Sequence, residues 1–234
     1  MNLLVSALSF PNDTGPIYRE TIEGRLPVEP FNTFSNLLFL AIVIYFSVRV
    51  YKNTKQQLFL AFALPILFIG FLGGTVYHAT RSHEIWLLMD WVPIVILCLS
   101  ASVYFTFKDG KNNLQKFGLL AIVFLLLFGA RFINWPLKLD ASIEYIGTAL
   151  GLLLPMGIYL VKTKFKFGKN ILFALLSFSA AITCRILDKR SDFLEMGTHW
   201  LWHSFGAISV FFLMRYIYKD RLRLSSENIE DENA

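Results

Sequence analysis

Residues 57–79 read QLFLAFALPILFIGFLGGTVYHA, and this stretch contains no Lys, Arg, Asp or Glu. A helix needs about 20 consecutive apolar residues to cross a bilayer core about 30 Å thick, because each residue adds about 1.5 Å of length. A surface helix of a soluble protein carries charged or polar residues along one face, whereas this stretch is apolar almost throughout. It therefore predicts a membrane-spanning helix, which ends close to a histidine, His78.

The rest of the chain repeats this pattern. Of the 234 residues, 55% are hydrophobic and only 17% are charged, whereas a soluble domain carries about 25% charged residues. This composition excludes an ordinary soluble globule, a disordered chain and a disulfide scaffold. We expect an all-α, polytopic membrane protein, with residues 1–234 forming one bundle of seven transmembrane helices in the cell or inner membrane or in an endomembrane. The seven stretches are Phe31–Val50, Gln57–Ala79, Glu84–Phe107, Asn113–Asn134, Ala141–Val161, Lys169–Leu187 and Glu195–Tyr218.

The basic residues between these stretches predict an orientation. The ends and connections that would lie on one side hold fourteen Lys and Arg, and those on the other side hold eight. Cytosolic loops of membrane proteins carry the excess of Lys and Arg. We therefore expect residues 1–30 to form an outer or lumenal segment and residues 219–234 to form a cytosolic tail. The same distribution explains the net charge of +5 without a nucleic-acid partner.

The four histidines of the chain, His78, His83, His199 and His203, all fall at the predicted outer end. His199 and His203 are four residues apart, so their imidazoles share one face of a helix and can hold one metal ion. His78 from another span would be a third ligand and would leave one coordination position for water. The alternative is that these are interfacial or packed histidines, because an H-x-x-x-H pair alone is a weak signal.

Asp90 lies inside the apolar segment LLMDWVPIV. A charged side chain at the centre of a transmembrane helix costs about 2.5–3.5 kcal/mol on insertion scales, so an acid there normally has a cationic partner, a metal or a catalytic role. One interpretation makes Asp90 a structural partner of Arg131 or Arg185. The other makes it a base beside the metal ion.

Polar side chains also gather before the first span, in Tyr18-Arg19-Glu20 and in EPFNTFSN at residues 29–36. Asn, Thr and Ser are typical of helix starts, and we interpret Thr33 and Ser35 as capping residues. Carboxylates beside amide oxygens can instead bind a hard cation such as calcium. Both interpretations remain open for Glu20 and Glu29.

Four segments together resemble the alkaline ceramidase family, which belongs to a wider group of seven-span metal hydrolases that includes the adiponectin and progestin receptors. They are EPFNTFSN (29–36), GGTVYHAT (73–80), LLMD (87–90) and HWLWHSFG (199–206), and they occur along the whole chain in the family's order. The resemblance implies a zinc ion held by His78, His199 and His203, with Asp90 as the acidic residue beside it.

The resemblance also implies a calcium site in the amino-terminal segment, in which Glu20 and Glu29 match two of the family's positions. The chain departs from the family's pattern at several positions. Gly74 stands where the family has a serine, and Thr75 could supply a hydroxyl but points about 100° further round the helix. The tryptophan and the first acid of the family's calcium motif are absent here, and Ile17 and Tyr18 stand in that neighbourhood.

The activity that the resemblance implies is hydrolysis of the amide bond of a ceramide-like lipid, which yields a fatty acid and a sphingoid base. Zinc lowers the pKa of a bound water from ~15.7 towards ~7 and stabilises the oxyanion, and Asp90 would accept the proton of that water. The alternatives are a seven-span lipid-binding receptor or scaffold with a structural zinc, and a zinc hydrolase of a different lipid. A structural zinc usually has four protein ligands, whereas only three histidines are expected here.

Overall fold

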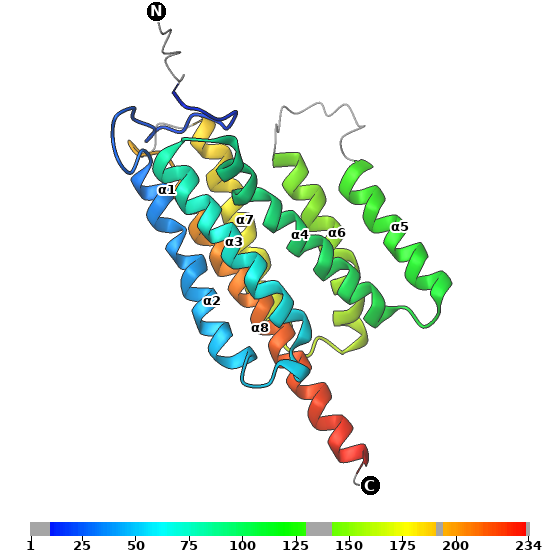
Figure 1. Cartoon of the computed structure of the whole chain (residues 1–234). Helices are drawn as coiled ribbons and strands as arrows, with labels where there is room; N and C mark the ends of the chain where they lie inside the picture. The colour runs from blue at the N-terminus through cyan, green and yellow to red at the C-terminus, as the bar shows by residue number, and fades with distance from the viewer. Residues whose placement is uncertain (1–9, 130–141, 191–193, 233–234) are drawn as a thin grey trace, which may run out of the picture.

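The computed structural model describes residues 10–129, 142–190 and 194–232, and every regular element within these ranges is a helix. The prediction of an all-α protein is thereby confirmed. The helices run alternately up and down, side by side in one bundle (Figure 1). They are α1 (Pro30–Ser35), α2 (Leu37–Val50), the 3-10 helix η1 (Thr54–Gln56), α3 (Leu58–Thr80), α4 (Glu84–Asp109), α5 (Asn113–Gly129), α6 (Ser142–Lys162), α7 (Gly168–Arg190) and α8 (His199–Glu232).

Four helical segments of the described chain are long and apolar enough to cross a membrane. They are Pro30–Val50, which joins α1 and α2, and then Leu58–Thr80, Glu84–Asp109 and Gly168–Asp188. These four correspond to the first, second, third and sixth of the predicted spans, and they are consistent with a membrane protein. The apolar helices Asn113–Leu126 and Gly147–Lys162 are shorter. Residues 130–141, where the predicted fourth span ends and the fifth begins, lie outside the described residues. The predicted seventh span falls within the described residues, mostly in α8, which is not among the four. The fourth, fifth and seventh spans therefore stay predictions.

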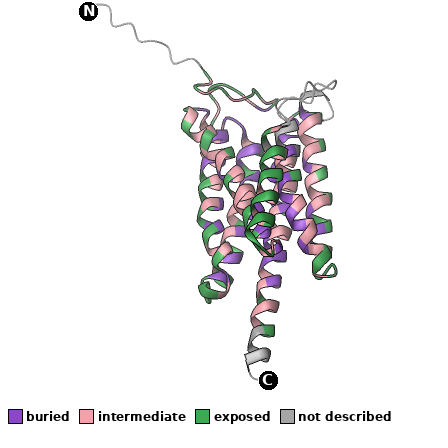
Figure 2. Ribbon diagram, turned by 90° about the vertical axis from the view of Figure 1, so that its right-hand side faces the viewer, coloured by how far each residue is buried: buried purple, intermediate pink, exposed green. Residues whose placement is uncertain are grey.

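The outer surface of the bundle is apolar. Leu114, Phe117 and Leu125 of α5 are among its exposed side chains, and Leu114 is 84% exposed. Figure 2 shows exposed positions along the outward faces of the helices. Water would disfavour so large an apolar surface, whereas the acyl chains of a bilayer would not. The buried core lies between the helices and is rich in aromatic side chains, among them Phe46, Phe105 and Tyr216.

The alternating course of the helices brings distant segments to one end of the bundle. Helix α3 ends at that end and packs along α4, which starts there. Helix α8 also starts there and packs along α7. Residues 10–29 lie across the same end, next to α1 (Figure 1). The end of α3, the start of α4, the start of α8 and the amino-terminal segment are therefore neighbours.

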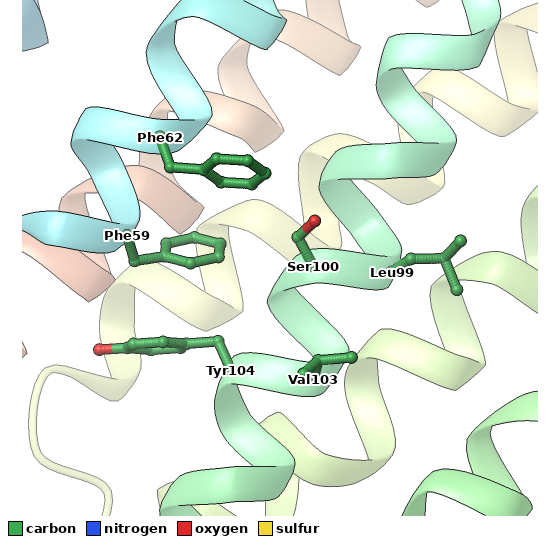
Figure 3. A pocket seen from close by; sticks show the side chains of 6 residues that line it. All are labelled: Phe59, Phe62, Leu99, Ser100, Val103 and Tyr104. Carbon is green, nitrogen blue, oxygen red and sulfur yellow. The ribbon is translucent and has the colours of Figure 1, made fainter.

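The opposite half of the bundle contains an apolar hollow of about 400 Å³ between α3 and α4. Side chains of both helices line it: Phe59, Phe62, Leu99, Ser100, Val103 and Tyr104 (Figure 3). Phe59 lies near the start of α3 and His78 near its end. The two are about 28 Å apart along the helix axis, so the hollow is not part of the histidine end.

Candidate metal centre

Three histidines meet at the end of the bundle described above. His78 comes from the last turn of α3, and His199 and His203 come from the first two turns of α8. One ligand nitrogen of each lies within 4.8 Å of the others, and all three residues are buried. The ring centroids are 4.8 Å apart for His78 and His203 and 4.7 Å apart for His199 and His203. The predicted grouping of these three side chains is confirmed, and they could hold a metal ion.

His78 is oriented by an acid of the amino-terminal segment. Its Nδ1 lies 2.5 Å from Oε2 of Glu29, and both side chains are fully buried. Its other ring nitrogen, Nε2, is buried and has no hydrogen-bond partner among the described residues. Leaving a buried polar atom unpaired is costly, and a metal ion would pair this one. A histidine that binds a metal through one nitrogen typically donates its other N–H to a carboxylate, so this ring fits a metal ligand.

His203 is oriented by helix α1. Its Nδ1 lies 3.2 Å from the carbonyl oxygen of Asn32 and 2.9 Å from Oγ of Ser35. The Ser35 hydroxyl itself donates to the same carbonyl oxygen. A carbonyl oxygen only accepts, so a proton on Nδ1 would satisfy this contact and would leave the lone pair of Nε2 for a metal. Nδ2 of Asn36, which only donates, lies 3.4 Å from the same nitrogen and would favour the other tautomer.

The capping interpretation of Thr33 and Ser35 was wrong. Helix α1 begins at Pro30 with Glu29 in the N-cap position, and both hydroxyls donate to carbonyl oxygens instead of accepting from free N–H groups. The free N–H groups at the start of α1 are satisfied by Glu20, whose carboxylate accepts from the backbone of Phe31 and Asn32.

His199 is fixed from both sides. Its backbone N–H, and that of Thr198, donate to Oδ1 of Asp188 at the end of α7, so Asp188 satisfies free N–H groups at the start of α8. The ring of Tyr18 stacks on the imidazole at a centroid distance of 3.9 Å. Burial raises the pKa of Tyr18 well above its ordinary value, so its hydroxyl stays protonated. Spacing along the chain did not reveal either contact.

Asp90 lies beside the histidines but outside the group of metal-ligating atoms. It is close enough to His78 and to Arg185 for direct electrostatic interaction with both. Its carboxylate sits against Gly74, one turn before His78 on α3: a Cβ at position 74 would be 2.3 Å from Oδ1 of Asp90 and 2.8 Å from Oδ1 of Asn36. The missing side chain at position 74 therefore makes room for this carboxylate. Arg131, the other predicted partner, lies outside the described residues.

The hydroxyl of Thr75 is buried and has no hydrogen-bond partner in the described part of the chain. Its catalytic role stays a prediction.

Glu20 and Glu29 differ in their surroundings. Burial raises the pKa of Glu20, although the two backbone N–H groups of α1 oppose this. Burial also raises the pKa of Glu29, but the hydrogen bonds from His78 and Thr21 and the charge of Arg81 outweigh burial, so its pKa lies below the ordinary value. Both carboxylates thus accept hydrogen bonds from groups of the protein itself, and calcium binding by either stays a prediction.

No known family model matches this chain, and no curated protein sequence matches it. The resemblance to the alkaline ceramidases therefore rests on the four quoted segments, and membership of the family stays a prediction.

Proposed function

We propose that this chain is an integral membrane zinc amidase that hydrolyses the N-acyl bond of ceramide-like lipids to a fatty acid and a sphingoid base. The observation that carries the proposal is the group of three buried histidines with the unpaired Nε2 of His78. Neutral imidazoles in a tetrahedral set with one open position are typical of catalytic zinc. A zinc ion held there would supply Lewis-acid chemistry, which activates water and polarises a carbonyl group.

The residues around the histidines would divide the remaining work. Asp90 would take the proton from the attacking water and return it to the leaving amine, because it lies on α4 within electrostatic reach of His78. Glu29 would hold the His78 imidazole, and the carbonyl oxygen of Asn32 would hold that of His203. Fixed ligand orientation is what keeps such a site ready for the reaction.

The membrane setting supports a lipid substrate. All seven predicted spans would cross the bilayer, with residues 1–30 outside and residues 219–234 in the cytosol. The lysine-rich connections lie at the end opposite the histidines, and the positive-inside rule would therefore put the histidine end outside. The reacting amide bond would then lie near the outer interface, while the two hydrocarbon chains of the substrate remain in the bilayer.

The test is direct hydrolysis by the purified protein in detergent. Ceramides of different acyl length are incubated with the zinc-loaded protein, with the chelator-treated protein and with the chelated protein after zinc is restored. We expect fatty acid and sphingoid base, measured by mass spectrometry, only when zinc is present. Absence of turnover on every N-acyl lipid, with zinc bound, would instead favour a lipid-binding receptor or scaffold with a structural metal. Turnover of another lipid class alone would retain the hydrolase and change its substrate.

A further inference from the structure

The end of α3 is tied to the amino-terminal segment by one arginine, Arg81. Its Nε and Nη2 donate to the two carboxylate oxygens of Asp13, at 2.9 and 2.6 Å. Its Nη1 donates to Oε1 of Glu29 at 2.6 Å and to the carbonyl oxygen of Pro16 at 3.0 Å. The side chains of Arg81, Asp13 and Glu29 are all fully buried. A planar guanidinium can bridge two carboxylates in this way, whereas a lysine cannot.

The backbone at Arg81 supports a specific role. Arg81 follows α3 in the left-handed conformation, with φ +48°. Glycine is the usual residue at this position after a helix, since a side chain is disfavoured there. A non-glycine residue keeps such a conformation only where its surroundings determine it, and these cases gather at functional sites. Here the turn directs the arginine side chain toward residues 13–16, where it donates to Asp13 and to the carbonyl oxygen of Pro16.

The contacts of Arg81 continue directly to the metal centre. Glu29 uses Oε1 for Arg81 and Oε2 for Nδ1 of His78, so its carboxylate is held at both oxygens. The backbone joins the same parts, because the N–H groups of Val28 and Glu29 donate to the carbonyl oxygens of Ala79 and His78. Asp13, Arg81, Glu29 and His78 thus form one continuous series of buried contacts.

The charges of this series favour a cation at the histidines. Two buried carboxylates would repel each other and would be costly to bury without a cation. One guanidinium neutralises only one of the two negative charges. The remaining negative charge is distributed over the carboxylates of Asp13 and Glu29, and Oε2 of Glu29 lies 2.5 Å from Nδ1 of His78. A carboxylate on one nitrogen of a histidine strengthens the binding of a metal by the other.

We propose that Arg81 is a positioning residue of the metal centre: it acts as an internal cation that fixes the Glu29 carboxylate against His78 and, through Asp13, fastens the amino-terminal segment over this end of the bundle. This inference rests on the proposed metal site but not on the identity of the lipid substrate. According to this proposal, the zinc affinity depends on Arg81, although Arg81 donates to Asp13 and Glu29 and is not itself a metal ligand.

The test measures the zinc affinity of full-length variants in detergent by competition with a fluorescent chelator. Arg81→Gln should weaken zinc binding about 10- to 100-fold, the range for loss of a group that orients a metal ligand. Arg81→Lys should also weaken it, since an ammonium group cannot hold Asp13 and Glu29 in the same geometry. The matched control is Arg49→Gln at the other end of the bundle, where Arg49 donates to the carbonyl oxygen of Tyr45 and lies over its ring. The zinc affinity of this variant should equal that of the unchanged protein.

Asp13→Asn provides a milder variant in case Arg81→Gln does not fold, because it keeps the contact between Arg81 and Glu29. It should weaken zinc binding by less than Arg81→Gln. A purely structural role for Arg81 would lower the melting temperature but leave the zinc affinity of the folded protein unchanged, and this result would overturn the proposal. Zinc affinities that follow the expected order without ceramide turnover would disprove the proposed activity alone. Turnover with unchanged affinities would disprove the positioning role alone.

Discussion

Position 74 shows how a single missing side chain can place a candidate catalytic group. Gly74 and Asp90 lie on neighbouring helices, and the Asp90 carboxylate occupies the space that a side chain at position 74 would fill. The backbone of α4 is also close at Gly73, where a Cβ would be 2.4 Å from the carbonyl carbon of Met89. A serine at position 74, as the resembling family has, would compete with Asp90 and Asn36 for the same space.

Gly74→Ala should therefore displace the Asp90 carboxylate. We expect a loss of stability of about 1–3 kcal/mol, the usual cost of overpacking, and a fall in ceramide turnover, with zinc content unchanged. Thermal unfolding, turnover and metal analysis measure these effects. The control is Gly157→Ala on α6, where the added Cβ would point into open space, with no described atom within 4 Å beyond the neighbouring residues and backbone of its own helix. Normal turnover in Gly74→Ala would show that the position of Asp90 does not matter for the reaction.

Asp90 itself is tested by removing its basic oxygen while keeping its shape. Asp90→Asn should retain zinc, because Asp90 is not in the group of ligand atoms. Hydrolysis should fall roughly 10²- to 10⁴-fold, the usual effect of losing a general base. The measurement combines zinc content with turnover on the best ceramide. Near-normal turnover would assign Asp90 to structure, as a partner of Arg185.

At the level of elements, α8 joins the two ends of the bundle. Its first two turns carry His199 and His203, and further along it carries Asp220, which is buried. Oδ2 of Asp220 accepts from Nζ of Lys108 on α4 at 2.5 Å and from the hydroxyl of Tyr159 on α6 at 2.9 Å. These contacts fix α8 against α4 and α6 far from the histidines, and they thereby hold His199 and His203 at a constant height along the bundle.

Because one helix supplies two of the three candidate ligands, metal content should depend mainly on α8. The purified protein should carry about one zinc per chain, and His199→Ala or His203→Ala should remove most of it. Elemental analysis after dialysis measures this. His83→Ala is the control: His83 is exposed and lies outside the group of three histidines, and its Nδ1 accepts from the N–H of Ile85 at the start of α4. Zinc that persists in the double variant of His199 and His203 would exclude the site.

At the level of the whole molecule, the two ends of the bundle differ in the residues that they carry. The histidines, Asp90 and the amino-terminal segment lie at one end, and the lysine-rich connections at residues 51–57, 108–112 and 162–169 lie at the other. Both Ser82 and Asn53 are exposed. Ser82 lies between α3 and α4 at the histidine end, and Asn53 lies between α2 and η1 at the other end. The two positions therefore report which end faces outward.

A cysteine at Ser82 should react with an impermeant thiol reagent from outside intact cells, and a cysteine at Asn53 should not, because the positive-inside rule puts Asn53 in the cytosol. The background lacks Cys98 and Cys184, so that only the new thiols react. Labelling is measured by mass shift, and permeabilised cells give the full signal for Asn53. The reverse pattern would place the metal centre at the cytosolic face and would leave its chemistry unchanged.

The sequence by itself determined those features that depend on neighbours along the chain. Apolar stretches of about 20 residues determined the helices, since a helix satisfies its own backbone hydrogen bonds. The spacing of His199 and His203 determined that they share a face, and the alternation of the helices determined that His78 lies at the same end. For Thr33 and Ser35, the sequence could not show whether the hydroxyl caps a helix by accepting from a free N–H group or donates to a carbonyl oxygen. Hydroxyl side chains near a helix start can do either.

Only the tertiary structure decided how the side chains at that end meet. Glu29 and His78 are 49 positions apart in the chain, and Ser35 and His203 are 168 apart. The stacking of Tyr18 on His199, the bridge from Arg81 to Asp13 and the fit of Asp90 against Gly74 likewise join different elements. Such contacts depend on the rotation and height of each packed helix and on the path of the amino-terminal segment, which the periodicity of a single stretch does not specify.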